Sequence, residues 1–271
     1  MRIIVVILAF INFKALAFLP TQQEHIEEKI RGATLSIEVW KRPINKKTGR
    51  RNIFDKEIFV SKGVGVHLGD GYILTAYHIV ESVAKREEYT YIKIYTKSGN
   101  PVKELSLSKC NPDVKDLRID VCLLKGKFLS EGEVSLPKDY NFEPNKKQVF
   151  GLINQVEELG KLGKVITGNF LKEVDLSKAK VKLKEIKNIT LYQTDIPTRP
   201  GNSGSVVFDT KTGRILGLTT SREKTTRKYD DGTVKVFHKA EVIPSSTIRK
   251  FLRIPGWKSK RLESWQTEFL N

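Results

Sequence analysis

The sequence contains few of the residues that build disulfide scaffolds and metal centres. Only two of its 271 residues are cysteines, Cys110 and Cys122, and four are histidines. Two cysteines exclude a fold held together by several disulfides, but they leave open either one bridge or two buried thiols. No pair of these histidines and cysteines has the spacing of metal ligands. The sequence therefore predicts neither a metal site nor another cofactor.

The sequence also lacks an apolar run that would span a bilayer comfortably. The apolar segment at residues 3–13 follows the short positive start at 1–2 and precedes a small-x-small motif at 15–17. This order is typical of a secretory signal peptide, with an uncleaved membrane anchor as the alternative. We therefore expect residues 1–17 to be a signal peptide and the protein to be exported, to the periplasm or the extracellular space.

Nucleic-acid motifs are absent as well, although the chain is strongly basic. The formal net charge is +17, and removing Arg2 and Lys14 with the signal peptide leaves 17 − 2 = +15. Basic residues cluster at 41–51, 222–228 and 249–261. No RNP-like aromatic strand, zinc-finger spacing or GxxG clamp accompanies them. The charge therefore predicts weak, non-specific binding of polyanions and no specific nucleic-acid partner.

What the sequence does contain is a series of short runs rich in β-branched and aromatic residues, separated by turn signals. These predicted strands are 34–40, 58–68, 71–80, 89–96, 119–125, 147–153, 205–209, 214–221 and 234–243. Helix signals lie mainly at the edges, at 22–32 and from 244 to 252. The pattern predicts an all-β barrel or sandwich, and 254 mature residues suit one two-barrel unit or two small domains.

Three segments at the edges of these strands carry the residues of a nucleophilic site. TAYH places His78 at the end of an apolar strand, DVCLLK places Asp120 at the start of another, and GNSGS places Ser203 in a glycine-bounded turn. A serine hydroxyl attacks only when an imidazole accepts its proton, and a carboxylate holds that imidazole in the right tautomer. The backbone N–H groups of Gly201 and Ser203 can converge on an oxyanion. Each segment is common alone, but the three together predict a catalytic triad.

Longer stretches around these residues resemble trypsin-like serine proteases of the chymotrypsin fold, most closely their HtrA/Deg branch. The matching stretches are 63–80, 115–125, 191–218 and 240–252. The resemblance implies two six-stranded antiparallel β-barrels with a C-terminal helix and a catalytic cleft between the barrels. It favours Asp120 over Asp116 as the acid, and it implies a serine endopeptidase acting on polypeptide substrates. The protease domain is then 18–253, and the tail at 254–271 is too short for the PDZ domain that usually follows.

The resemblance also implies where the side chain before the scissile bond binds. Pro197 takes the floor of that pocket, and Thr219, Thr220, Ser221 and Arg222 lie along the strand that walls it. An uncharged floor disfavours lysine and arginine, because a buried unpaired ammonium is costly. We therefore expect small aliphatic residues first, acidic residues second, because Arg222 lies near the rim, and basic residues last.

Two alternatives remain open. Ser205 stands where HtrA proteases generally have glycine, and GNSGS is also typical of bacterial glutamyl endopeptidases. The pocket strand of those enzymes carries a histidine, which is missing from 216–224. The other alternative is a catalytically idle binding module with a protease fold, which captures polyanions or a protein partner. A binding module has no need of the triad. Labelling of Ser203 by a fluorophosphonate separates an active serine peptidase from such a module.

Overall fold

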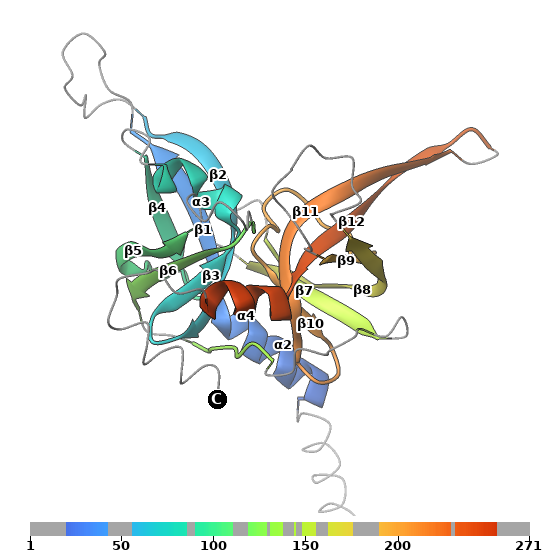
Figure 1. The fold of residues 1–271 in the computed structure, drawn as a ribbon, viewed down its shortest axis with the longest axis horizontal. Helices are drawn as coiled ribbons and strands as arrows, with labels where there is room; N and C mark the ends of the chain where they lie inside the picture. The colour runs from blue at the N-terminus through green and yellow to red at the C-terminus, as the bar shows by residue number, and fades with distance from the viewer. Residues whose placement is uncertain are drawn as a thin grey trace, which may run out of the picture.

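The computed structural model describes residues 20–42, 56–85, 90–110, 119–128, 131–137, 144, 148–155, 162–175, 190–228 and 231–253. The first half of this chain forms α2 (Gln22–Ala33), β1 (Thr34–Lys41), β2 (Ile58–Gly69), β3 (Tyr72–Thr75), α3 (Tyr77–Ala84), β4 (Thr90–Tyr95), β5 (Lys103–Cys110) and β6 (Cys122–Lys127). The second half forms β7 (Val149–Gln155), β8 (Leu162–Asp175), β9 (Thr190–Thr194), β10 (Val206–Asp209), β11 (Ile215–Lys228), β12 (Val234–Pro244) and α4 (Ser245–Arg253). The strands fall into two antiparallel groups that lie side by side (Figure 1).

The first barrel is a six-stranded sheet in the order β4-β1-β2-β3-β6-β5. Its two edges meet next to β4, where Tyr95 forms a bridge with Pro101 and Val102 N–H donates to the Ile94 carbonyl at 2.8 Å. Cys110 and Cys122 occupy facing positions of β5 and β6 and are joined as a disulfide. The bridge that the sequence left open is therefore present, immediately after the segment that carries Asp120.

The second barrel is closed, in the order β10-β11-β12-β9-β8-β7. Its interior is filled by apolar side chains, most of them aromatic or branched, which are Phe150, Leu152, Phe170, Tyr192, Ile196, Val207, Leu216, Ala240 and Val242. Together the two barrels and the helix α4 confirm the predicted all-β fold of two six-stranded antiparallel barrels with a C-terminal helix.

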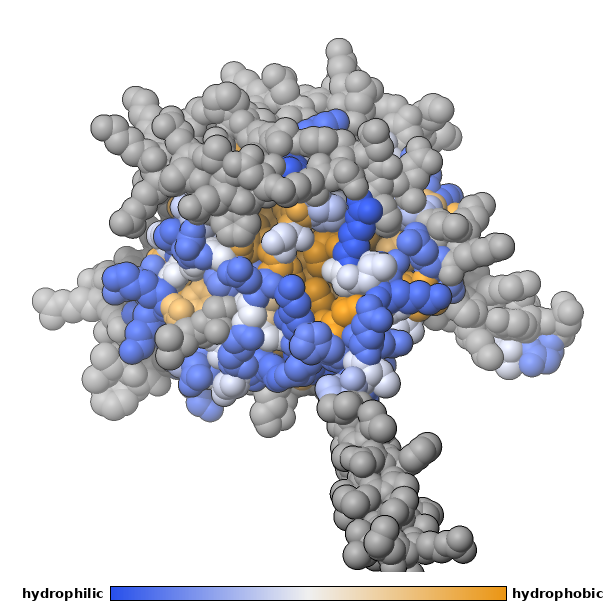
Figure 2. All heavy atoms as spheres, turned by 90° about the horizontal axis from the view of Figure 1, so that it is seen from below, coloured by the Kyte–Doolittle hydropathy of each residue, from blue (hydrophilic) through white to orange (hydrophobic). Residues whose placement is uncertain are grey.

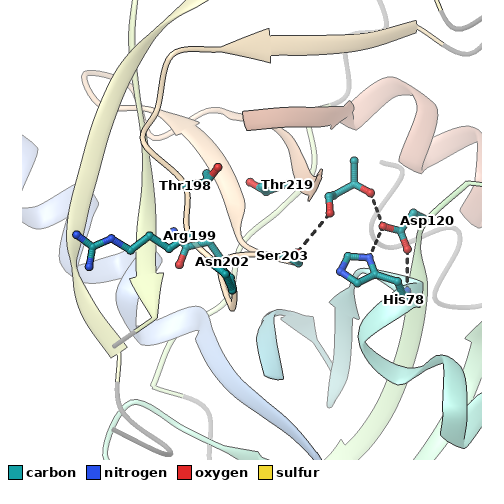
Figure 3. A pocket seen from close by; sticks show the side chains of 9 residues that line it. His78, Asp120, Thr198, Arg199, Asn202, Ser203 and Thr219 are labelled. Atoms are coloured by element: carbon teal, nitrogen blue, oxygen red, sulfur yellow. Dashed lines mark hydrogen bonds and ion pairs between the residues drawn. The ribbon is translucent and has the colours of Figure 1, made fainter. Parts of the chain in front are cut away.

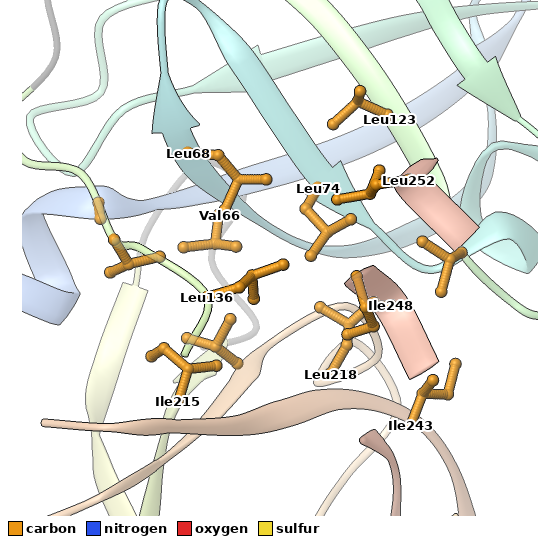
Figure 4. Packing of buried hydrophobic residues seen from close by; sticks show 14 of the residues in the cluster. Val66, Leu68, Leu74, Leu123, Leu136, Ile215, Leu218, Ile243, Ile248 and Leu252 are labelled. Atoms are coloured by element: carbon orange, nitrogen blue, oxygen red, sulfur yellow. The ribbon is translucent and has the colours of Figure 1, made fainter. Parts of the chain in front are cut away.

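The contact between the barrels explains why several strands are apolar on both faces. Successive side chains of a strand point to opposite faces, so a strand between two cores has no polar side. In β3, Ile73 packs into the first barrel while Leu74 packs into the interface, and in β6 Leu124 and Leu123 divide in the same way. Figure 4 shows side chains from both barrels and from α4 meeting in this interface core.

Two helices cover the interface. The helix α2 begins with a capping box between Thr21 and Glu24, and it buries Ile30 and Ala33 in the interface core. From α4, the guanidinium of Arg249, which is 1% exposed, donates to the carbonyls of Leu136 and Pro137. Seen from below, hydrophilic side chains cover most of the described face and apolar side chains show between them (Figure 2).

The predicted elements agree with the structure in most places and differ in four. The segment predicted as one strand over 71–80 is divided, because the chain turns after Thr75 into α3. The strands β5, β8 and β9 were not predicted. None of the helices in the described ranges is long and apolar enough to cross a membrane. The predicted signal peptide at 1–17, the tail at 254–271 and Asp116 lie outside the described residues.

Candidate active site

His78 lies in the first turn of α3, not at the end of a strand as the sequence indicated. The strand β3 ends at Thr75, whose buried hydroxyl donates to the Val64 carbonyl at 2.7 Å. Ile79 and Val80 then anchor α3 in the first barrel. Because these neighbours point inward, the imidazole of His78 faces outward, and its side chain is 45% exposed.

Asp120 lies two residues before the start of β6 and binds His78 at two points. One carboxylate oxygen accepts a hydrogen bond from the His78 Nδ1 at 2.6 Å, and the other accepts from the backbone N–H of His78 at 2.8 Å. The hydroxyl of Thr220 donates to the same oxygen that binds Nδ1. The carboxylate is therefore fixed from both barrels, since His78 belongs to the first and Thr220 to the second.

These contacts shift the pKa values of both groups. The hydrogen bond to Asp120 raises the pKa of His78 above its ordinary 6.5, although burial acts in the opposite direction. Burial opposes the ionisation of Asp120, but hydrogen bonds from His78 and Thr220 outweigh it and hold the pKa of Asp120 below 3.8. Asp120 is thus ionised at neutral pH, and its hydrogen bond to Nδ1 leaves Nε2 as the basic nitrogen of neutral His78.

Ser203 lies in a turn that is bound tightly to both barrels. Its carbonyl accepts a hydrogen bond from Val64 N–H of β2 at 2.8 Å, and the next N–H, that of Gly204, donates to the Thr219 carbonyl at 2.7 Å. Gly204 has φ +83°, and a Cβ there would lie 2.0 Å from the Val64 carbonyl oxygen. Only glycine therefore fits this position. The Ser203 hydroxyl donates to the Thr220 carbonyl at 3.3 Å (Figure 3).

The same turn presents two backbone donors with no acceptor in the described part of the chain. They are the N–H groups of Gly201 and Ser203, whereas the intervening N–H of Asn202 donates to the Arg199 carbonyl at 3.1 Å. Gly201 has φ +95°, a conformation that favours glycine. Two neighbouring N–H groups whose hydrogens are not already engaged are suited to binding an oxyanion.

His78, Asp120 and Ser203 line one cavity of about 410 Å³. Of the four expected wall residues, Thr219 and Thr220 line it too. The described side chains do not include those of Ser221 and Arg222, whose backbones pair with Glu241 and Ala240 of β12. The other lining residues are Thr198, Arg199, Pro200 and Asn202.

The expected pocket floor differs from what the structure places around this cavity. Pro197 is exposed and does not line it, because the chain turns Thr198 inward instead. Asp195 is exposed as well, and its carboxylate accepts from the N–H of Asn169. The sequence reasoning missed Thr198, although its closeness to the GNSGS turn was a signal that could have found it. Among the described residues no group of three or more His, Cys, Asp or Glu side chains could hold a metal ion.

A family model for the trypsin-like peptidase domain matches residues 63–218, more than half of the chain. The chain belongs to the trypsin-like peptidase family. It is a serine endopeptidase with the chymotrypsin fold, as the sequence predicted. No curated protein matches this peptidase in sequence.

Among solved structures, the peptidase is similar in fold to Rv3671c from Mycobacterium tuberculosis H37Rv, in the inactive form of a serine-to-alanine mutant. The TM-score is 0.56 and the identity 14%, and the match covers 84% of the peptidase and 88% of that chain. At this identity the likeness concerns the fold alone.

Proposed function

We propose that this peptidase is exported and that it cleaves peptide bonds through a triad of Ser203, His78 and Asp120. The observation that carries the proposal is the two-point contact of Asp120 with His78, at 2.6 and 2.8 Å, in the cavity that also contains Ser203. This contact fixes both the orientation and the tautomer of the imidazole, which is what a general base for a serine needs.

The reaction then proceeds in two halves. For attack, the Ser203 hydroxyl turns from the Thr220 carbonyl toward Nε2 of His78, and its oxygen bonds to the scissile carbonyl carbon while its proton moves to Nε2. The resulting oxyanion accepts hydrogen bonds from Gly201 and Ser203 N–H. His78 next protonates the leaving amine as the C–N bond breaks. Water then attacks the acyl carbon of the ester while His78 takes its proton. The bond between that carbon and the Ser203 oxygen breaks, and His78 returns the proton to this oxygen as the second product leaves.

Export is proposed from the segment at 1–17, with its short positive start, apolar run and small-x-small motif. The disulfide between Cys110 and Cys122 is compatible with export, because disulfides persist in oxidising compartments.

The order of specificity predicted from the sequence places basic residues last. The cavity supports that part of the order, since Asp120, the one carboxylate that lines it among the described side chains, already accepts hydrogen bonds from His78 and Thr220. A buried ammonium would therefore lack a partner.

The test of the proposal is hydrolysis of a mixed peptide library by the purified protein. We expect cleavage by the wild type and none by Ser203→Ala, with unchanged circular dichroism, because the substitution removes only the attacking oxygen. Hydrolysis that survives in Ser203→Ala would contradict the assignment.

A further inference from the structure

Two buried threonine hydroxyls face the active-site cavity without any partner among the described residues. Thr198 and Thr219 are each 2% exposed, and both line the cavity. Their Oγ1 atoms are buried and make no hydrogen bond in the described part of the chain. Figure 3 shows the two side chains opposite each other, with both oxygens directed into the space between them. Buried hydroxyls are normally paired, so an unpaired couple in a cavity indicates a missing polar ligand group.

The neighbouring hydroxyls differ from this pair. Thr220 donates to Asp120, Thr75 donates to the Val64 carbonyl, and Ser205 donates to the Ile153 carbonyl at 3.1 Å. These three hydroxyls around the Ser203 turn are therefore satisfied within the fold. The cavity-lining hydroxyls without a partner in the described part of the chain are those of Thr198 and Thr219, which Figure 3 shows opposite each other.

The charges around the cavity restrict what this ligand group can be. Among the described side chains, Arg199 is the only Lys or Arg that lines it, and its exposed side chain extends away from the two threonines (Figure 3). Among the described side chains a carboxylate would find no cationic partner, and it would lie close to ionised Asp120. An ammonium would find no available carboxylate among the same side chains. A fully apolar side chain would leave both hydroxyls unpaired, and sites with buried hydrogen-bonding groups reject such analogues.

We propose that this cavity binds the carboxamide of a glutamine or asparagine side chain, and that Thr198 and Thr219 are specificity-determining residues. A hydroxyl can donate and accept, so one threonine donates to the amide oxygen while the other accepts from the amide nitrogen. The inference rests on the proposed triad, because it assigns this carboxamide to the residue before the scissile bond. It replaces the small aliphatic residue that the sequence placed first.

The first test compares wild-type kcat/KM on peptides that are identical except for glutamine, glutamate, methionine or alanine before the scissile bond. We expect glutamine to exceed each of the other three by about tenfold or more at pH 8, since each hydrogen bond to a hydroxyl contributes a factor of this order. Equal or faster cleavage after glutamate would show a carboxylate site. Equal or faster cleavage after methionine or alanine would show that the hydroxyls do not recognise the substrate. Either result overturns the inference.

The second test removes each hydroxyl with the isosteric substitutions Thr198→Val and Thr219→Val. The glutamine-to-methionine ratio of kcat/KM should fall about tenfold in each variant. Thr194→Val is the matched control, because Thr194 is also buried, its hydroxyl has no partner among the described residues, and it does not line the cavity. An unchanged ratio in both cavity variants, or an equal fall in the control, would contradict the role of these residues. If a valine variant does not fold, the wild-type series still decides.

Labelling of Ser203 by a fluorophosphonate in the same preparation separates this inference from the proposed function. A labelled enzyme without a preference for glutamine overturns the specificity alone. A folded wild-type protein that resists both the probe and every peptide contradicts the triad itself.

Discussion

At the scale of single residues, the Asp120 carboxylate is the best-connected group of the site. It accepts from the ring and the backbone of His78 and from the hydroxyl of Thr220. These contacts explain why the pKa of His78 is raised and that of Asp120 lowered. Both shifts lead to measurable effects on catalysis.

The pH dependence of hydrolysis reports the His78 pKa. Only neutral His78 accepts the serine proton, so kcat/KM should fall as the pH drops through the raised pKa, with a midpoint above 6.5. Asp120→Asn removes the hydrogen bond and the charge that raise this pKa. Its midpoint should therefore move to lower pH, and kcat should fall on the order of 10⁴-fold. A wild-type midpoint below 6.5 in the pH–rate profile would contradict the raised pKa.

The sequence assigned Thr220 to the pocket wall, but its contacts make it a positioning residue for Asp120. Thr220→Val removes one hydrogen bond to a charged group, so kcat/KM should fall about tenfold and the pKa of Asp120 should rise. Thr220→Ser keeps the hydroxyl and should retain most of the activity. Steady-state kinetics on both variants provide the measurement, and equal losses in the two would exclude a role for the hydroxyl.

At the scale of elements, the turn that carries Ser203 depends on its contact with β2. Gly204→Ala adds a Cβ that would lie 2.0 Å from the Val64 carbonyl oxygen, at φ +83°. We expect the variant to be less stable by more than about 1 kcal/mol and to lose activity. Thermal unfolding and peptide hydrolysis measure the two effects.

Gly99→Ala is the matched control for this prediction. Gly99 has a similar φ of +80°, but nothing lies within 4 Å of the added Cβ. Backbone strain is therefore common to both substitutions, and only Gly204→Ala should displace the catalytic turn. Similar losses of activity in the two variants would show that the contact with β2 has no part in catalysis.

The elements also show how far the sequence could lead. Strands such as β1 and β12 were predictable, because their β-branched residues lie between clear turn signals. The helix α3 was not, since Ile79 and Val80 are β-branched and continue an apolar strand, and only packing in the first barrel makes this segment helical. The strand β8 contains two glycines and two lysines, and its ladders with β7 and β9 depend on partners elsewhere in the chain.

The candidate site, too, could be predicted from the sequence only in part. His78, Asp120 and Ser203 were predicted as a triad from their residue types and order, and the structure brings all three to one cavity. The unpaired hydroxyls of Thr198 and Thr219 could not be predicted. Whether a hydroxyl has a partner depends on tertiary neighbours that the linear sequence does not reveal.

At the scale of the whole molecule, the cavity lies where two barrels meet, so each supplies part of the site. The first barrel holds His78 and Asp120, and the second holds Ser203 and the two threonines. The interface core shown in Figure 4 fixes these halves relative to each other. This arrangement explains why the proposed catalytic residues, which lie far apart in sequence, converge.

The net charge also acts at this scale, since it is +17 for the full sequence and +15 without residues 1–17. We expect the protein to bind heparin and single-stranded DNA weakly and without sequence preference, since binding through charge alone releases counterions. The affinity measured by fluorescence anisotropy should fall steeply between 50 and 200 mM salt, about as expected for non-specific contacts. Tight, sequence-selective binding that persists in high salt would instead support the binding-module alternative.

The most direct measurement is the reaction of the folded protein with a fluorophosphonate at pH 8, followed by peptide mapping of the adduct. An activated serine predicts one adduct, on Ser203, that is absent in Ser203→Ala and forms at least about 10³-fold more slowly in His78→Ala. Ser205→Ala is the matched control, because the buried Ser205 hydroxyl is bonded to the Ile153 carbonyl, and this variant should still be labelled on Ser203. A folded wild-type protein that forms no adduct, or a Ser203→Ala variant that still does, would contradict the assignment of Ser203 as the nucleophile.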